Sequence, residues 1–249
     1  MGKLKTVLIL LLAAAVIVGC AYLPGFVGTM QDNAENEVRY AEIQALQLQL
    51  GNAQRGELPM LGKLSLLKRG TTMEIAEENA AMLPDTVLDR SHTEFSRYMD
   101  CGLIRTELDF SNIWATPFLV FSPEDPDVNF IYWSVEVLDS SVNTSLTLLI
   151  DDETGKLLRI DYYTDEWYYT PEEQYYLLDT FYNVYMESLD LIEELKARED
   201  AVSDRETFTE DISTDGSAGI RVRFSDPEYG EVNLDFYVHP NGFYCYFYS

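Results

Sequence analysis

The most specific chemical pattern in the chain is a serine followed three positions later by a lysine, Ser65 and Lys68. In penicillin-binding enzymes a lysine at this spacing activates the serine as a nucleophile, and a Lys-Thr-Gly strand completes the site. The sequence Lys-Thr-Gly is absent, and Thr154, Gly155 and Lys156 stand in the wrong order. We therefore interpret the Ser-x-x-Lys spacing as coincidence.

Histidine and cysteine form no catalytic or metal-binding pattern. His92 and His239 are the only two histidines, and no His-x-x-x-His or Cys-x-x-Cys spacing occurs. A phosphate-binding loop ending at Gly155 and Lys156 would need a glycine where Ile150 stands. We therefore expect no cofactor, no metal and no enzymatic activity.

Carboxylates are too numerous for a catalytic pair to be selected from the pattern, since the chain has 43 Asp and Glu residues. The run Asp151, Asp152 and Glu153 offers oxygen ligands for Ca²⁺ but lacks the Asp-x-Asp-x-Asn-Gly frame. We predict a solvated hairpin turn there. A hydrolase built on paired carboxylates is kept as an alternative function.

Aromatic residues are densest between Tyr162 and Tyr185. Many of them fit a helix stripe or alternate strand positions and are expected to pack as core. Trp167, Tyr168 and Tyr169 fall between the expected strand and helix, where rings can be exposed. Exposed rings stack on sugars or contact proteins over a large area at low entropy cost. These three residues are the predicted interaction surface.

The charge of the chain limits its partners. Its formal net charge is −26, and Lys3 and Lys5 precede every acidic residue. So acidic a surface repels nucleic acid and favours neutral glycans, cations or basic protein surfaces. We expect no nucleic-acid partner.

Residues 1–30 are predicted to hold the chain at a membrane. The apolar run from Val7 to Val27 is long enough, at about 1.5 Å per residue, to cross a hydrocarbon core of roughly 30 Å. Lys3 and Lys5 precede it and acidic residues follow, so the positive-inside rule places the N-terminus in the cytoplasm. The chain from about Gln31 onward is expected to be extracytoplasmic.

Two alternatives to an uncleaved span remain open. Ile17, Val18, Gly19 and Cys20 resemble a bacterial lipobox, which makes Cys20 a candidate for lipidation. A cleaved secretory signal is the third reading. The span and the lipid both tether the module on the outer face, whereas cleavage of a signal would release it there.

Cys101 and Cys245 are the remaining cysteines, an even pair in a compartment that permits disulfides. They are a candidate disulfide. Two buried free thiols are the alternative.

The predicted fold class is α+β: an N-terminal membrane anchor helix, then helices packed on antiparallel sheet. Residues 31–70 are expected to form a juxtamembrane helix and linker. Residues 71–169 begin with a capping box at Thr71 and Glu74 and continue into strands, which predicts a first helix-plus-sheet unit. Residues 170–249 are predicted to form a long helix capped by Thr170 and then C-terminal antiparallel hairpins.

The strand patterns of the two halves resemble one another. Residues 133–163 carry three strands with an acidic turn, and residues 221–248 carry three strands with a turn at His239–Gly242. Two tandem helix-plus-hairpin units are therefore a finer hypothesis, with chance similarity of aromatic hairpins as the alternative.

The segment from Trp133 to Val137, the strand Leu146–Ile150 and the turn Asp151–Leu158 together resemble the PepSY family. Members have a helix followed by an antiparallel sheet, a Trp-x-Val type strand and a hairpin with an Asp-x-x-Thr-Gly-Lys-like turn. The resemblance covers about Thr71 to Tyr163. It implies a small extracytoplasmic interaction domain, of a class associated with regulating envelope proteases and with sensing, and it brings no catalytic residues.

Together these patterns predict a membrane-anchored, extracytoplasmic, non-enzymatic module that binds a protein of the cell envelope. A glycan-binding module that uses exposed aromatic rings is the first alternative.

Overall fold

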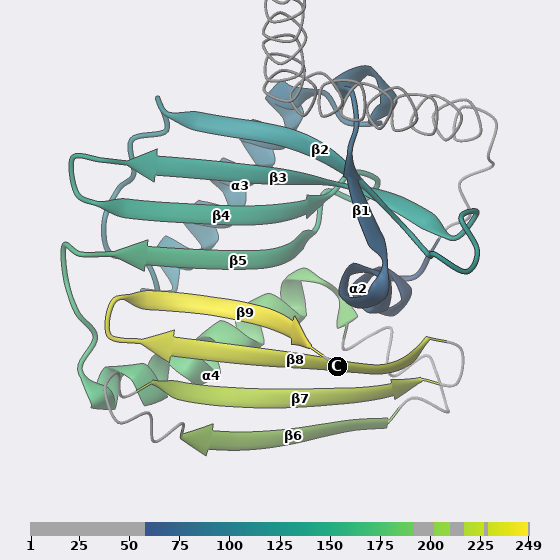
Figure 1. The fold of residues 1–249 in the computed structure, drawn as a ribbon. Helices are drawn as coiled ribbons and strands as arrows, with labels where there is room; N and C mark the ends of the chain where they lie inside the picture. Colours follow the sequence, from purple (N-terminus) through teal and green to yellow (C-terminus); the bar gives the residue numbers. More distant parts are fainter. Residues whose placement is uncertain (1–57, 192–201, 210–216, 227–228, 249) are drawn as a thin grey trace, which may run out of the picture. The chain divides into compact units, whose positions relative to one another are not determined.

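The described part of the chain forms one antiparallel sheet of nine strands (Figure 1). The computed structural model describes residues 58–191, 202–209, 217–226 and 229–248. The chain divides into two units, Met1–Gln54 and Arg55–Ser249, and every described residue belongs to the second. In chain order the strands are β1 Thr71–Glu74, β2 Ile113–Phe121, β3 Asn129–Asp139, β4 Thr144–Asp151, β5 Leu157–Thr164, β6 Val202–Thr209, β7 Ala218–Asp226, β8 Gly230–His239 and β9 Gly242–Tyr248.

The sheet has two halves, one formed by β1–β5 and the other by β6–β9. Across it the strands follow the order β1-β2-β3-β4-β5-β9-β8-β7-β6, so β5 and β9 are the only neighbours that join the halves. Helix α3, Pro84–Asp100, precedes β2–β5, and helix α4, Pro171–Ser188, precedes β6–β9. Both helices lie on one face of the sheet (Figure 1). A third helix, α2, spans Met60–Arg69 and contacts β2, β8 and β9.

The predicted fold class is wrong in one respect, its division of the strands between two units. Two tandem units are not formed, because β5 pairs with β9 and makes one continuous sheet. The predicted N-terminal membrane anchor helix has no support in the described residues, where no helix is long and apolar enough to cross a membrane. Residues 1–30, on which that prediction falls, lie outside the described part.

Two helix boundaries differ from the expected ones. Thr71–Glu74 is strand β1 rather than a capped helix, because it pairs in register with Phe118–Phe121 of β2. The helix begins instead at Pro84, a residue that suits the first turn because it lacks an N–H to leave unpaired. The juxtamembrane helix expected within residues 31–70 falls largely on residues outside the description, and α2 occupies the last part.

Helix α4 begins as the sequence predicts. The Glu173 N–H donates to the Thr170 hydroxyl at 3.3 Å, and the Thr170 N–H donates to the Glu173 carboxylate at 2.8 Å. This capping box satisfies two N–H groups that the first helical turn leaves without intrahelical partners.

The core is aromatic where the two halves of the sheet meet. Phe243 of β9 contacts Tyr98 of α3 at a ring separation of 5.7 Å and Phe181 of α4 at 4.9 Å. Tyr162 of β5 lies 5.4 Å from the same ring. Each of these four side chains is almost completely buried. Burial of such rings supplies much of the hydrophobic stabilisation at the join.

The join between β5 and β9 is short. Its register contains three pairs, Asp161 with Tyr244, Tyr162 with Phe243, and Tyr163 with Gly242. A Cβ atom on Gly242 would lie 2.0 Å from the Tyr162 carbonyl oxygen, so only glycine permits this approach of the backbones. Such a short join needs support from elsewhere in the fold.

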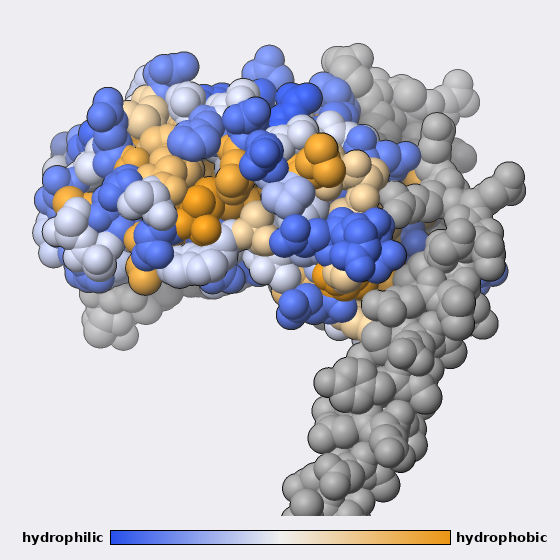
Figure 2. All heavy atoms as spheres, turned by 90° about the horizontal axis from the view of Figure 1, so that it is seen from above, coloured by the Kyte–Doolittle hydropathy of each residue, from blue (hydrophilic) through white to orange (hydrophobic). Residues whose placement is uncertain are grey.

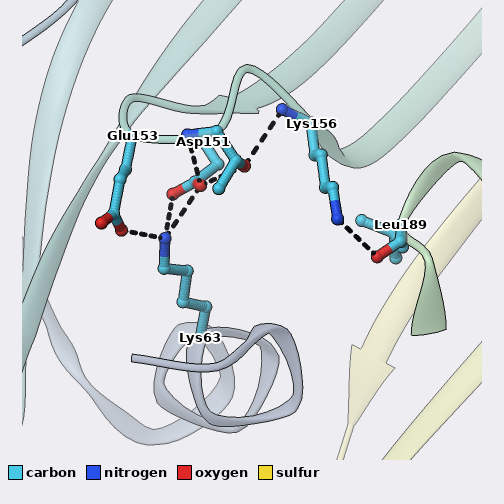
Figure 3. A network of polar contacts seen from close by, with 6 residues as sticks. Lys63, Asp151, Glu153, Lys156 and Leu189 are labelled. Atoms are coloured by element: carbon cyan, nitrogen blue, oxygen red, sulfur yellow. Dashed lines mark hydrogen bonds and ion pairs between the residues drawn. The ribbon is translucent and has the colours of Figure 1, made fainter. Parts of the chain in front are cut away.

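Helix α2 supplies part of that support through a buried cation (Figure 3). The Lys63 ammonium donates to both Asp151 carboxylate oxygens at 3.0 and 2.9 Å and to Glu153 at 2.7 Å. Lys63 and Asp151 are almost inaccessible to solvent. On its other side α2 reaches the second half: the Ser65 hydroxyl donates to the Tyr229 carbonyl at 2.8 Å.

The β4–β5 hairpin that receives Lys63 also holds both long helices. Asp152 accepts hydrogen bonds from the Ala81 and Met82 N–H groups, which precede α3, and from the buried Trp133 indole. Lys156 donates to the Leu189 carbonyl at the end of α4 (Figure 3). The predicted solvated turn is therefore wrong, because Asp151 and Asp152 are buried and fully engaged.

Replacing Lys63 with methionine is expected to lower the free energy of unfolding by about 3–5 kcal/mol, because the buried Asp151 carboxylate loses its cation. Lys68→Met is the matched control on the same helix. Lys68 donates to the Glu231 carbonyl in an exposed position, so its loss should cost less than about 1 kcal/mol. Urea unfolding of the two variants measures both values, and equal losses would contradict this role of Lys63.

The buried tyrosines predict alkaline unfolding. Burial raises the pKa of Tyr162 from 10.0 to about 12 and raises the pKa of Tyr98 and Tyr185 well above its usual value. Since folding favours the protonated phenols, their stabilisation is complete below pH 10.0 and is lost as the pH rises through about 12. Absorbance at 295 nm and far-UV circular dichroism should therefore show a tyrosinate step that coincides with loss of structure. Complete ionisation of all tyrosines before any loss of structure would exclude this burial.

Candidate functional site

The face of the sheet opposite α3 and α4 carries aromatic side chains where the two halves join. Strand pairing aligns Tyr244 with both Asp161 and Tyr237, and Tyr163 with Gly242. Because side chains alternate along a strand, these rings point away from the helix-covered core that holds Tyr162 and Phe243. We call Tyr163, Tyr237, His239, Tyr244 and Tyr246 the aromatic cluster.

The rings of the aromatic cluster form a continuous series of contacts. Centroid separations are 6.4 Å from Tyr163 to His239 and 5.6 Å from His239 to Tyr244. Tyr244 lies 5.0 Å from Tyr237 and 4.6 Å from Tyr246. The cluster therefore crosses β5, β9 and β8 and draws on both halves of the sheet.

The two ends of the aromatic cluster are the most exposed. Tyr163 retains 42% and Tyr246 44% of its accessible surface, whereas Tyr237 is buried. Large aromatic rings held by neighbours but open on one side lose little entropy when a partner covers them. Tyr163 and Tyr246 are therefore suited to contact a partner.

Paired charges lie beside the rings. The Arg159 guanidinium lies 4.9 Å from the centre of the Tyr246 ring and binds Asp161 at 2.5 Å. Burial raises the pKa of Asp161, and the adjacent Arg159 acts in the opposite direction. Arg159 Nε and Asp161 Oδ1 are buried with no hydrogen-bond partner among the described residues.

A second ion pair borders the cluster on β7 and β8. Arg221 donates to both oxygens of Asp235 at 3.0 and 2.9 Å, and the Tyr237 hydroxyl donates to the same carboxylate at 3.2 Å. The positive charge of Arg221 compensates the negative charge of Asp235. Asp165 also borders the aromatic cluster, where it accepts a hydrogen bond from the Tyr163 hydroxyl.

The predicted surface of Trp167, Tyr168 and Tyr169 does not form one exposed patch. Only Tyr168 is open to solvent, at 62%. The half-buried Trp167 donates to the Thr106 hydroxyl at 3.0 Å, and the buried Tyr169 hydroxyl donates to the Leu103 carbonyl. The structure brings Trp167 and Tyr169 together in an edge-to-face contact at 4.5 Å, directed inward.

The candidate disulfide is not formed. Cys101 and Cys245 are both free thiols. The Cys101 thiol, at the end of α3, donates to the Tyr98 carbonyl, whereas Cys245 is buried in β9. Burial raises the pKa of the Cys245 thiol well above its usual value, so it behaves as an inert core residue. Cys20, the lipidation candidate, lies outside the described residues.

The remaining chemical patterns hold structural positions. Ser65 and Lys68 each donate to a backbone carbonyl beside or within β8, at Tyr229 and Glu231 respectively. His92 packs against Phe110 at 4.0 Å. Within the described residues, no group of three or more His, Cys, Asp or Glu side chains is arranged to hold a metal ion.

Comparison of the chain with protein-family models, with curated proteins and with solved structures finds no match. The candidate site therefore stands on the geometry of this chain.

The aromatic cluster was missed by sequence reasoning, although a signal for it exists. Tyr237 and His239 are two residues apart on β8, as are Tyr244 and Tyr246 on β9, which is the period of one strand face. The pairing of β5 with β9, which brings Tyr163 beside them, depends on a contact between distant segments that no local pattern reveals.

Nitration by tetranitromethane should separate the exposed from the buried rings. Tyr163, Tyr246 and Tyr168 are expected to react in the native protein, whereas Tyr169 and Tyr237 react only after unfolding. Peptide mass spectrometry reads each site. The adjacent pair Tyr168 and Tyr169 is the internal control, and equal modification of that pair would contradict the inward packing of Tyr169.

Proposed function

We propose that this chain is a non-enzymatic protein-interaction module of the cell envelope, which binds its partner through the aromatic cluster. In this proposal residues 1–30 hold the chain at the membrane, by the apolar run or by lipid on Cys20, and the sheet lies outside the cytoplasm. The observation that carries the proposal is the continuous series of rings on the face opposite α3 and α4, exposed at Tyr163 and Tyr246.

The composition of this surface favours a protein partner. Interface centres are enriched in tyrosine and arginine, and the aromatic cluster with Arg159 shares that enrichment. The acidity of the whole chain then favours a partner with a neutral or basic surface.

Among the described residues, the two carboxylates with a pKa raised by burial give no support to the hydrolase alternative. Glu94 and Asp161 both have a pKa raised by burial. Glu94 lies on α3, which covers one face of the sheet, whereas the side chain of Asp161 points to the other. The two acids therefore do not form a pair that could flank one substrate bond.

Glycan binding remains a second candidate, favoured by the exposed rings of Tyr163 and Tyr246 on the face of the sheet opposite α3 and α4. Sugars stack on such rings through their apolar faces. The PepSY-like resemblance, which stays a prediction, agrees with the protein-interaction proposal.

The test is affinity capture of partners from solubilised cell envelope by the full-length chain and by the double variant Tyr163→Ala/Tyr246→Ala. Loss of the two exposed rings is expected to weaken capture of the partner at least about tenfold, as for residues at the centre of an interface. Quantitative mass spectrometry of the captured proteins measures the effect.

Tyr175→Ala/Tyr176→Ala is the matched control, because these two tyrosines are also exposed but lie on α4. It should capture the partner as the parent chain does. Retention on cell-wall polysaccharide that depends on Tyr163 and Tyr246, with no protein captured, would favour glycan binding instead. Equal capture by all three chains would refute a role for the aromatic cluster.

A further inference from the structure

The outer edge of β2 is only partly covered. Strand β1 pairs with Phe118–Phe121, and the Ile75 N–H donates to the Pro117 carbonyl at 3.1 Å. Ile113–Thr116 pairs with β3 on its inner side, and no described strand pairs with its outer side. An open strand edge presents backbone groups that can pair with another extended chain.

The register identifies which backbone groups point outward. The Leu138 N–H donates to the Asn112 carbonyl at 3.2 Å, which makes this a hydrogen-bonded pair of the ladder. Because bonded and non-bonded pairs alternate in an antiparallel ladder, Trp114 and Thr116 bond to β3. Ile113 and Ala115 therefore direct their N–H and C=O groups away from the sheet. Pro117 lies two residues after Ala115 and so has the same orientation. Its carbonyl accepts from the Ile75 N–H on the outer side of β2.

Most of the devices that protect an open edge are absent from this stretch, although an edge proline, Pro117, directly follows it. Lysine, a bulge and an inward-pointing charge each discourage pairing, and Ile113–Thr116 has none of them. Trp114 is instead exposed at 51%. Figure 2 looks onto this side of the molecule and shows apolar residues exposed among hydrophilic ones.

The surroundings of this edge are acidic. Residues 106–140 contain no Lys or Arg. The exposed Glu136 of β3 pairs directly with Trp114. Near the start of β2, the Asp109 N–H donates to the Asp139 carboxylate. A basic segment would gain from these charges, whereas a second copy of this acidic chain would meet like charge. A Lys or Arg side chain can also stack on the exposed Trp114 ring.

We propose that Ile113–Thr116 of β2 binds an extended, Lys- or Arg-containing segment of a protein partner as an additional strand of the sheet. The backbone groups of Ile113 and Ala115 supply the pairing, and the acidic surroundings with Trp114 select basic side chains. This edge is separated from the aromatic cluster by β3 and β4, so either surface can fail without the other.

The test uses an eight-residue peptide alternating threonine and lysine, labelled for fluorescence anisotropy, with the full-length chain. We expect it to bind, and the matched threonine–glutamate peptide not to bind. Methylating the backbone nitrogens of every second residue, in one phase or the other, is expected to weaken binding at least about tenfold in at least one phase, because the bonds to β2 are lost. Binding by both methylated peptides equal to the parent would show attraction by charge alone and overturn the proposal.

A variant of the protein tests the same edge. Ala115→Pro removes an N–H that points outward and is not used by β3, so circular dichroism should be unchanged while peptide binding weakens at least about tenfold. Ala115→Ser keeps the N–H and should bind as the parent does. Failure of the threonine–lysine peptide to bind the parent chain, or a dimer of the parent that Ala115→Pro converts to monomer, would overturn the proposal.

Discussion

Lys63 is the buried charge on which the assembly of this sheet depends. An ammonium group removed from water is costly unless anions replace the solvent, and Asp151 with Glu153 does so at 2.7 to 3.0 Å. This need for anions fixes the position of α2. The lysine can only be satisfied if α2 lies against the β4–β5 hairpin. The same helix bonds through Ser65 to the Tyr229 carbonyl, immediately before β8. One ion pair thus fixes α2 between segments that pair directly at only three register positions.

The candidate site follows from that arrangement. The aromatic cluster lies on β5, β9 and β8, so it exists as one surface only while the two halves remain joined. On the opposite side of the same join, Phe243 is covered by Tyr98 and Phe181. The inner rings hold the strands together, and the outer rings, on alternate residues of the same strands, are presented to solvent. A rigid support of this kind suits binding, because rings held by their neighbours lose little freedom on contact.

Local patterns in the sequence predicted local structure well. The Thr170 cap and the hairpin at Asp151–Gly155 both depend on residues close together in the chain, and both are present. The predicted helix at Thr71 is wrong because pairing with β2, far away in sequence, overrides a capping pattern. The same limit explains the burial of Asp151 and Asp152. Asp151 binds Lys63 from 88 residues earlier, and Asp152 binds the Ala81 and Met82 N–H groups. The pairing of β5 with β9 has no local signature, and so neither the single sheet nor the aromatic cluster was predicted.

The central claim is that the two halves behave as one sheet held at the β5–β9 join. Native-state hydrogen exchange of the backbone amides on β3, β4, β7 and β8 tests it most directly, because each half contributes two interior strands. We predict that the most protected amides of both halves open with the same free energy, and that Lys63→Met lowers protection in both halves together. Exchange of one half at a clearly lower free energy, with the other unaffected by Lys63→Met, would show two independent units and contradict the account.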